Sequence, residues 1–202
     1  WWSLAKSPEY YQWRKNNPSE PSQAMLDGTQ FHTAVLEPAR YNSEYIAAPG
    51  GIDRRTKAGK EAWAYFESIS VGKCIVTHEK MDMVTGMVAS LAKSETANAL
   101  LEMDPVVGDG KAEQSIFFND ADYGFLCKVR PDYLNPKYRA IIDLKSAKDV
   151  SPEGFSKAIA NYGYHRQAHF YLKGVNQIIP DEYENFIFVC VEPLPPYQVA
   201  VY

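Results

Sequence analysis

Two aspartates and a lysine stand close together in the sequence and have the chemistry to bind a metal ion beside a phosphate. Asp132 closes one apolar stretch, and Asp143 and Lys145 flank Leu144 at the end of the next. Alternate side chains of a strand share a face, so we expect Asp143 and Lys145 to point the same way while Leu144 points into the core. Carboxylate oxygens around an open coordination position suit Mg²⁺ or Mn²⁺.

An isolated Asp-x-Lys triplet is more often a solvated pair on the surface of a protein. Here the apolar residues Ile141, Ile142 and Leu144 indicate a buried strand. A buried charge is costly unless a partner or a metal ion compensates it. The local sequence therefore favours a functional metal site over a surface ion pair.

Pro131-Asp132 followed by Asp143-Leu144-Lys145 resembles the signature of the PD-(D/E)xK nucleases. More closely, the chain resembles the nuclease domain of the RecE family, exodeoxyribonuclease VIII, from about Ser7 to Cys190. The acid-x-Lys triplet alone is a weak motif, but five blocks in the same order are a strong one. The other four blocks are GTQFHTAVLEP (28–38), DRRTKAGKE (53–61), AEQSIFF (112–118) and YGYHRQAHFY (162–171).

The resemblance assigns roles to residues that composition alone would not select. A lone helical histidine such as His32 is usually part of the core, and Glu113 alone would be a surface acid opposite in face to its neighbours. The resemblance makes Glu113 a catalytic acid and a candidate metal ligand. The other implied metal ligands are His32, Asp132, Asp143 and the backbone carbonyl of Leu144.

Gln167 and Tyr171 match a Gln-x-x-x-Tyr motif of the same family. Residues four apart share a face of a helix, so both side chains can orient Lys145 or contact the scissile phosphate. Without the resemblance, a solvated polar face would be the preferred interpretation. Lys145 itself has two candidate roles, which are positioning the attacking water and stabilising the charge that develops on the phosphate.

Four basic residues concentrate positive charge in a chain whose net charge is −4. They are Arg54, Arg55, Lys57 and Lys60, next to flexible glycines, and they are candidate contacts for the DNA backbone. A solvated start of a helix explains such a cluster equally well. The overall acidity excludes a protein coated in basic residues, so any DNA-binding charge must be local.

Composition excludes several other classes of protein. Three scattered cysteines without a CxxC pair indicate neither a structural zinc site nor a disulfide framework, and they are too few for an iron–sulfur cluster. No apolar run approaches the ~20 residues that span a bilayer, and the start of the chain has no signal-peptide pattern. We therefore expect a cytoplasmic protein without membrane contact.

The hydrophobic pattern predicts a helical N-terminal region, about 1–105, followed by a sheet-centred core, about 106–202, within a single nuclease domain over 1–202. Helices are expected over 4–15, 23–36, 56–69, 78–101 and 151–171. Strands are expected over 112–118, 125–129, 138–144 and 186–191, with an edge strand over 199–202. The order predicts a mixed α/β (α+β) fold with the αβββαβ nuclease core, in which helices flank a central mixed sheet.

Together these features predict a Mg²⁺-dependent deoxyribonuclease in which Mn²⁺ can substitute. Resemblance to the RecE family implies 5′→3′ degradation of one strand of linear double-stranded DNA, a ring-shaped homo-tetramer, and a single-strand annealing protein that receives the 3′ tail. Two alternatives remain open: a structure-specific or restriction-type endonuclease on the same core, and a non-catalytic DNA-binding module.

Overall fold

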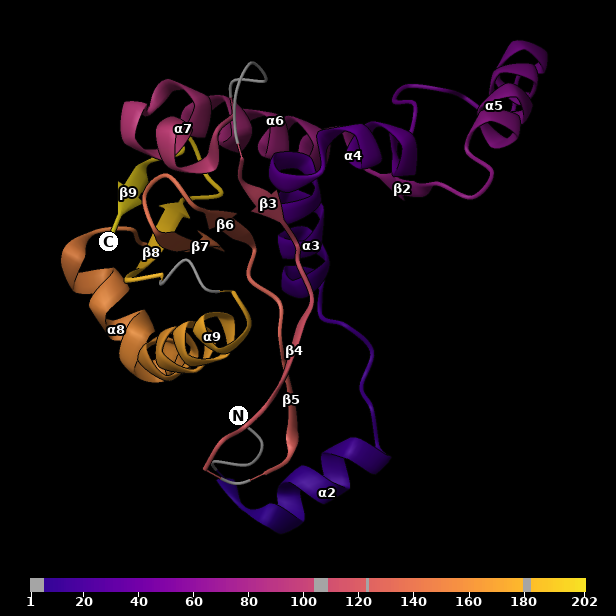
Figure 1. Ribbon diagram of the computed structural model, residues 1–202. Coiled ribbons are helices and arrows are strands. Elements are labelled where there is room, and N and C mark those ends of the chain that lie inside the picture. The colour runs from indigo at the N-terminus through magenta and orange to yellow at the C-terminus, as the bar shows by residue number, and fades with distance from the viewer. Residues whose placement is uncertain (1–5, 104–108, 123, 180–182) are drawn as a thin grey trace.

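A five-stranded mixed sheet forms the centre of the computed structural model, which describes residues 6–103, 109–122, 124–179 and 183–202. β7 and β8 are parallel, and the other neighbouring pairs are antiparallel. Helices cover both faces (Figure 1), which confirms the predicted fold class. In order, the strands are β3 (Lys111–Ala112), β6 (Tyr133–Asn135), β7 (Ala140–Ser146), β8 (Asn185–Val191) and β9 (Val199–Val201).

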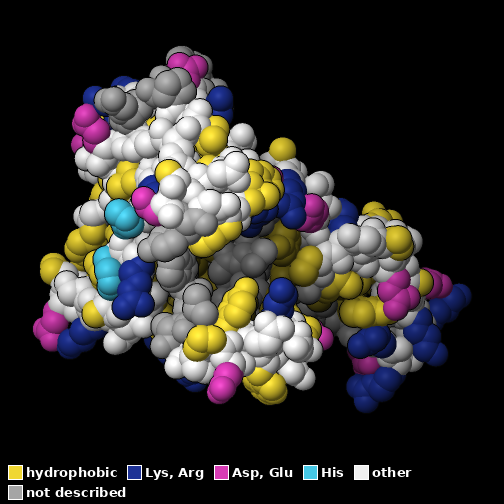
Figure 2. All heavy atoms as spheres, turned by 60° about the horizontal axis from the view of Figure 1, so that its bottom comes forward, with side chains coloured by type: hydrophobic (Ala, Val, Ile, Leu, Met, Phe, Trp, Pro, Cys, Tyr) yellow, Lys and Arg dark blue, Asp and Glu magenta, His cyan; other side chains and the backbone are white. Residues whose placement is uncertain are grey.

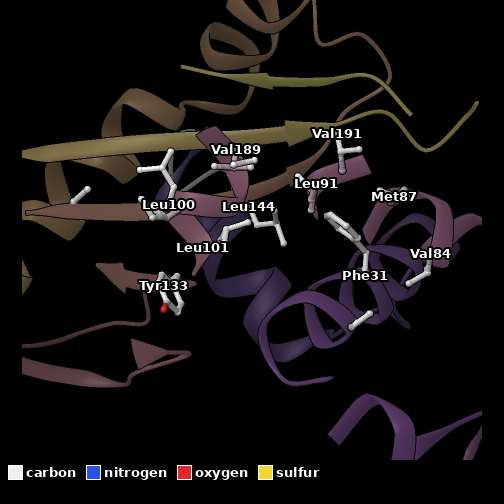
Figure 3. Packing of buried hydrophobic residues seen from close by; sticks show 14 residues of the cluster. Phe31, Val84, Met87, Leu91, Leu100, Leu101, Tyr133, Leu144, Val189 and Val191 are labelled. Atoms are coloured by element: carbon white, nitrogen blue, oxygen red, sulfur yellow. The ribbon is translucent and has the colours of Figure 1, made fainter. Parts of the chain in front are cut away.

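Three helices pack on one face of the sheet: α3 (Gln23–Leu36), α6 (His78–Lys93) and α7 (Glu95–Leu101). Figure 3 shows Leu144 of β7 among the buried side chains of this layer, close to Leu101 and Phe31. Leu144 therefore points into the core, as its alternation with Asp143 and Lys145 predicts. The helix predicted over 78–101 is divided, because the side chain of Ser94 accepts a hydrogen bond from the Ala97 amide and caps a new helix.

Two helices cover the opposite face: α8 (Pro152–Tyr162) and α9 (Tyr164–Ile178). Phe155 of α8 is buried against Phe188 and Cys190 of β8. The single helix predicted over 151–171 is wrong, because Gly163 adopts φ 69° and ends α8 before α9 begins. The odd-numbered residues of β7, which include Asp143, face this helical layer.

A β-hairpin formed by β4 (Ile116–Asn119) and β5 (Leu126–Val129) is a sheet of its own, apart from the main one. The predicted meander of 112–118, 125–129 and 138–144 is therefore wrong. The chain leaves the main sheet after β3 and returns to it at β6, a strand that lies where a turn was predicted around Asn135. Tyr123, in the turn predicted between the hairpin strands, lies outside the described residues.

The N-terminal half adds elements that project from the central sheet (Figure 1). Ser7 caps α2 (Pro8–Asn16) and Pro8 occupies its first turn, as predicted, whereas residues 4–5 and the predicted boundary near 105 lie outside the described residues. None of the helices in the described part of the chain is long and apolar enough to cross a bilayer. The projecting elements are α4 (Pro38–Glu44), β1 (Tyr45–Ala47), α5 (Lys57–Ile69) and β2 (Cys74–Val76), with β1 and β2 paired in parallel.

Candidate metal-dependent active site

The candidate site forms where β7 runs past the end of β6. The two strands pair only from Ala140 opposite Asn135 to Ile142 opposite Tyr133. Beyond this point β6 no longer supplies hydrogen-bond partners to β7. The side chain of Asp132 takes over, and its Oδ2 accepts a hydrogen bond of 2.8 Å from the amide of Leu144. The end of β6 thus holds the Asp132 carboxylate beside Asp143.

Three of the predicted metal-binding side chains converge on this point. One ligand atom from each of His32, Glu113 and Asp132 lies within 4.8 Å of the other two. Nδ1 of His32, on α3, lies 3.5 Å from Oδ2 of Asp132. Elements far apart in the sequence thus bring together an imidazole and two carboxylates, a donor set that suits a divalent cation.

Glu113 owes its position to a break in the strand rather than to alternation along it. Its φ is 53°, in the left-handed region that side chains rarely adopt. Its amide donates a hydrogen bond of 2.9 Å to the carbonyl of Asp132. The chain therefore turns at Glu113 in a conformation that costs about 1–3 kcal/mol, and a second acid comes to lie beside Asp132.

Arg130 also contacts Glu113, and sequence reasoning missed it. Its Nε lies 2.9 Å from Oε2 of Glu113. No hydrogen bond to this buried Oε2 is found within the described residues, so its contact with Arg130 is an ion pair. The sequence offered one indication of this contact, which is that Arg130 directly precedes the Pro131-Asp132 motif.

A second group of side chains, on the α9 side, surrounds the buried Asp143. Nε2 of Gln167 donates a 2.5 Å hydrogen bond to Oδ1 of Asp143. The Lys145 ammonium forms an ion pair with Oδ2 of the same carboxylate, so each oxygen of Asp143 has one partner among the described residues. Nζ of Lys145 also lies 4.7 Å from the ring centroid of Tyr164, a neighbour that sequence reasoning did not single out within its block.

Tyr171 lies one helical turn beyond Gln167 on α9. Burial raises the pKa of Tyr171, with the charges of Asp143 and Asp132 acting in the same direction, so its hydroxyl remains protonated at neutral pH. The structure therefore places Gln167 and Tyr171 on the side of the site where Asp143 and Lys145 meet. The carbonyl of Leu144 as a metal ligand stays a prediction.

Burial dominates the electrostatics of the two aspartates. It raises the pKa of Asp132 to about 6 and that of Asp143 to about 6, although the charge of Lys145 opposes both shifts. Both carboxylates are therefore ionised at pH 7, but only by a small margin. Such shifted acids in one cluster are typical of functional sites.

The pKa values of the two basic side chains, His32 and Lys145, shift in opposite directions. Burial and the nearby Lys145 charge lower the pKa of His32, so its imidazole is neutral at pH 7. Burial alone would lower the pKa of Lys145, but the carboxylates of Asp143 and Asp132 outweigh it and the net shift is upward. The site therefore holds a neutral imidazole able to bind a metal and a lysine that keeps its charge.

A divalent cation fits these residues. Among the described residues, the two buried carboxylate oxygens Oε2 of Glu113 and Oδ2 of Asp143 are each partnered by one cationic side chain, Arg130 and Lys145 respectively, so each keeps a lone pair available to a bound cation. Carboxylate oxygens are the ligands that Mg²⁺ and Mn²⁺ prefer, whereas an imidazole is more usual for Zn²⁺ and Fe²⁺, so the donor set suits a divalent cation without selecting one metal. His32, Glu113 and Asp132 would hold the cation, with Asp143 next to them.

A cavity of about 720 Å³ opens beside the site. Its walls come from α3, α6, α8 and the end of β7, and they include His32 and Lys145. Lys148 and Lys157 add positive charge to the lining, and Tyr162 adds an aromatic ring that is 70% exposed. Asp27 and Asp149 also line the cavity, so the site adjoins a hollow whose lining carries both signs of charge.

The four basic residues predicted to contact DNA lie elsewhere. Lys57 and Lys60 are in the first turns of α5, which lies beyond α4 and β2 from the central sheet (Figure 1). Figure 2 shows Lys and Arg side chains gathered at the edge of the molecule where Figure 1 places α5. Arg55 pairs with Asp53, and the guanidinium of Arg54 lies 4.0 Å from the ring centroid of Trp63.

Comparisons with known proteins agree with this fold. A family described as "PDDEXK-like domain of unknown function (DUF3799)" matches residues 3–202. A crystal structure described as that of a "Putative exonuclease" from Eubacterium rectale superposes with a TM-score of 0.61 and 15% sequence identity, covering 99% of this chain and 67% of that one. At this identity the likeness concerns the fold alone. A search of curated proteins finds no match.

Proposed function

The chain belongs to the PDDEXK-like family DUF3799, and from this premise we propose that it is a Mg²⁺-dependent deoxyribonuclease that hydrolyses phosphodiester bonds. The observation that carries the proposal is the convergence of His32, Glu113 and Asp132 within 4.8 Å, beside the buried pair of Asp143 and Lys145. A fold that had lost its catalytic function would be free to lose these charges, each of which is costly to bury.

The side chains of this site divide the work of hydrolysis. His32, Glu113 and Asp132 would hold the divalent cation, together with Asp143 and the carbonyl of Leu144. When bound, such a cation would supply positive charge at the scissile phosphate. Gln167 orients Asp143 through its hydrogen bond, and Tyr171 lies on the same face of α9, where its protonated hydroxyl can donate to a phosphate oxygen.

Lys145 keeps its charge beside Asp143 and faces the ring of Tyr164. A lysine held in this way can orient the attacking water or stabilise the charge that develops on the phosphate. Removal of such a donor typically slows a reaction by roughly 10²–10³-fold. The ring of Tyr164 restricts where the ammonium can lie, which supports either role.

The finer features of the proposal come from the resemblance to the RecE family. They are 5′→3′ degradation of one strand of linear double-stranded DNA, 3′ single-stranded tails, transfer of the tails to an annealing protein, and a ring-shaped homo-tetramer. Lys145 lines the cavity beside the site, and this supports a path for one DNA strand through the cavity to the site. A ring would also explain how an acidic chain can retain DNA.

Digestion of end-labelled DNA tests the proposal. The protein is incubated with linear duplex and with closed-circular duplex, in Mg²⁺ and in EDTA. We expect Mg²⁺-dependent loss of the linear DNA from its 5′ ends and no effect on the circle. Cutting of the circle would instead identify an endonuclease, and no digestion of either DNA in Mg²⁺ or Mn²⁺ would overturn the proposal.

A further inference from the structure

The β4–β5 hairpin presents an outer face on which aromatic, apolar and basic side chains meet. Phe117 lies opposite Lys128 in the register, and Asn119 lies opposite Leu126. Phe117 is 55% exposed and Leu126 is 68% exposed, although both are large apolar residues. Nζ of Lys128 lies 5.4 Å from the ring centroid of Phe117. We call these four residues, together with Arg130, the outer face of the hairpin.

The inner side of the hairpin is already occupied. Ile116, Phe118 and Val129 are buried in one cluster with Val175 of α9. The acids near the tip also turn this way, because Lys173 of α9 pairs with both Asp120 and Asp122. The contacts of its inner side therefore hold the hairpin in place, and the exposed side chains of the outer face do not contribute to them.

The charge of the outer face selects its partner. Lys128 and Arg130 are basic, and none of its residues is acidic, in a chain with 25 acidic residues and a net charge of −4. Exposed aromatic rings alternating with cations are the surface that single-stranded nucleic acids use, since bases stack on the rings while phosphates pair with the cations. Arg130 pairs with Glu113, whereas no ion pair of Lys128 is found within the described residues, so Lys128 is the cation that a purely apolar protein contact would not need.

The outer face also begins at the candidate active site. Arg130, whose side chain is 59% exposed, lies 2.9 Å from the Glu113 carboxylate of the metal-binding cluster. From Arg130 to Leu126 the strand extends about 13 Å, at roughly 3.3 Å per residue. At about 3.4 Å per nucleotide in a stacked strand, this length matches about four nucleotides leading to or from the site.

We infer that the outer face of the hairpin binds a single-stranded segment of DNA next to the scissile phosphate. Phe117 stacks on a base, and Lys128 and Arg130 contact the phosphates on either side. The inference rests on the proposed nuclease function in one respect, which is that the bound strand is the substrate of the enzyme.

Binding of fluorescein-labelled oligo(dT), about 12 nucleotides long, tests the inference by fluorescence anisotropy in EDTA, where no cleavage occurs. We expect Phe117→Ala to weaken binding by roughly 5- to 100-fold. Phe117→Leu should weaken it similarly, whereas Phe117→Trp should retain it, because stacking needs a ring and not only an apolar surface. Lys128→Ala should reduce the salt dependence of single-strand binding by about 0.7 in slope.

Several results would contradict the inference. Equal affinities of wild type and Phe117→Ala, or full binding by Phe117→Leu, would overturn the inference. So would sedimentation showing that the wild type self-associates while Phe117→Ala does not, if the affinity for oligo(dT) is the same. Digestion of linear DNA separates the two proposals: a wild type that digests DNA while Phe117→Ala binds normally contradicts only the hairpin surface. A wild type that binds oligo(dT) through Phe117 without digesting DNA contradicts only the nuclease.

Discussion

The amide of Glu113 donates a hydrogen bond to the carbonyl of Asp132, and this contact joins the two segments through which the chain leaves and re-enters the central sheet. Glu113 lies where the chain leaves the sheet, and Asp132 lies where it returns. The β4–β5 hairpin is the segment between them, and because its two strands are antiparallel, the two carboxylates come together at its base. The site is therefore a product of how the hairpin separates from the sheet.

The left-handed backbone at Glu113 predicts a difference between two substitutions at this position. Glycine adopts φ 53° without the steric cost that alanine retains, so Glu113→Gly should be more stable than Glu113→Ala by about 1 kcal/mol. Both variants should lose part of the stabilisation by Mg²⁺, because both lack the carboxylate. Thermal unfolding with and without Mg²⁺ measures both effects. Equal stabilities of the two variants would show that the backbone at this position is not strained.

Loss of the central charges should stop digestion without unfolding the protein. Lys145→Ala should reduce the rate by roughly 10²–10³-fold, and Asp132→Ala or Asp143→Ala should reduce it to background. Removing one acid from the cluster relieves repulsion between carboxylates in the metal-free protein, so both aspartate variants should fold. Single-turnover digestion and circular dichroism provide the measurements. Near-normal digestion by folded Asp143→Ala would contradict the assignment of the site.

His32→Ala should raise the Mg²⁺ concentration needed for half-maximal activity. Its neutral imidazole lies among the oxygen ligands, 3.5 Å from Asp132. His169→Ala is a matched control, because His169 is exposed on α9. A Mg²⁺ titration of both variants, with thermal unfolding alongside, distinguishes the roles. If activity of His32→Ala falls only in proportion to lost folded protein, His32 is part of the core and not a ligand.

Local patterns predicted the parts of the site that depend on one element. Alternation along β7 placed Leu144 in the core and Asp143 with Lys145 on the other face, because a strand has a fixed period of two. The bounds of α3 follow from the Ser22 cap and Pro38, both of which act locally.

The remaining features depend on contacts between distant segments. Nothing local predicts that Glu113 breaks a strand, since a left-handed glutamate is unfavourable by itself and is held by its hydrogen bond to Asp132. The contact of Arg130 with Glu113 likewise requires the hairpin to leave the sheet. By contrast, the divisions at Ser94 and Gly163 were visible as capping residues and were overlooked within long hydrophobic patterns.

Stabilisation by Mg²⁺ should depend on pH near 6. A carboxylate must lose its proton to bind a metal, and burial raises the pKa of Asp132 and that of Asp143 to about 6. The increase in unfolding temperature caused by Mg²⁺ should therefore be full at about pH 7.5 and small at about pH 5. An equal increase at both pH values would show that neither aspartate binds the metal.

In the metal-free protein, Asp132 and Asp143 should make the folded state less stable as the pH rises, which is the opposite of the pH dependence of stabilisation by Mg²⁺. Their folded pKa lies above the unfolded value of about 3.9, so between about pH 4 and 6 the folded state holds more protons than the unfolded state. Their contribution to stability is therefore greatest at low pH and is lost as the pH rises through about 6. Thermal unfolding in EDTA, compared between wild type and the Asp132→Asn, Asp143→Asn double variant, isolates this contribution.

The basic cluster at the start of α5 gives the last prediction. Arg54 and Arg55 are candidate partners of the DNA backbone, although Arg55 pairs with Asp53 in the free protein. Removing one cation that pairs with a phosphate should reduce the salt slope of duplex binding by about 0.9. The Arg54→Ala, Arg55→Ala double variant should therefore bind duplex more weakly at low salt and with a shallower salt dependence, while its Mg²⁺ affinity stays unchanged.

Lys148→Ala is the comparison for this double variant, because Lys148 lines the cavity beside the candidate site. Both proteins are measured by anisotropy with a labelled duplex in EDTA over a range of salt concentrations. An unchanged slope in the arginine variant, with a shallower slope in Lys148→Ala, would contradict the prediction. In that case the duplex follows the cavity that Lys148 lines, and the cluster at the start of α5 is a solvated start of a helix.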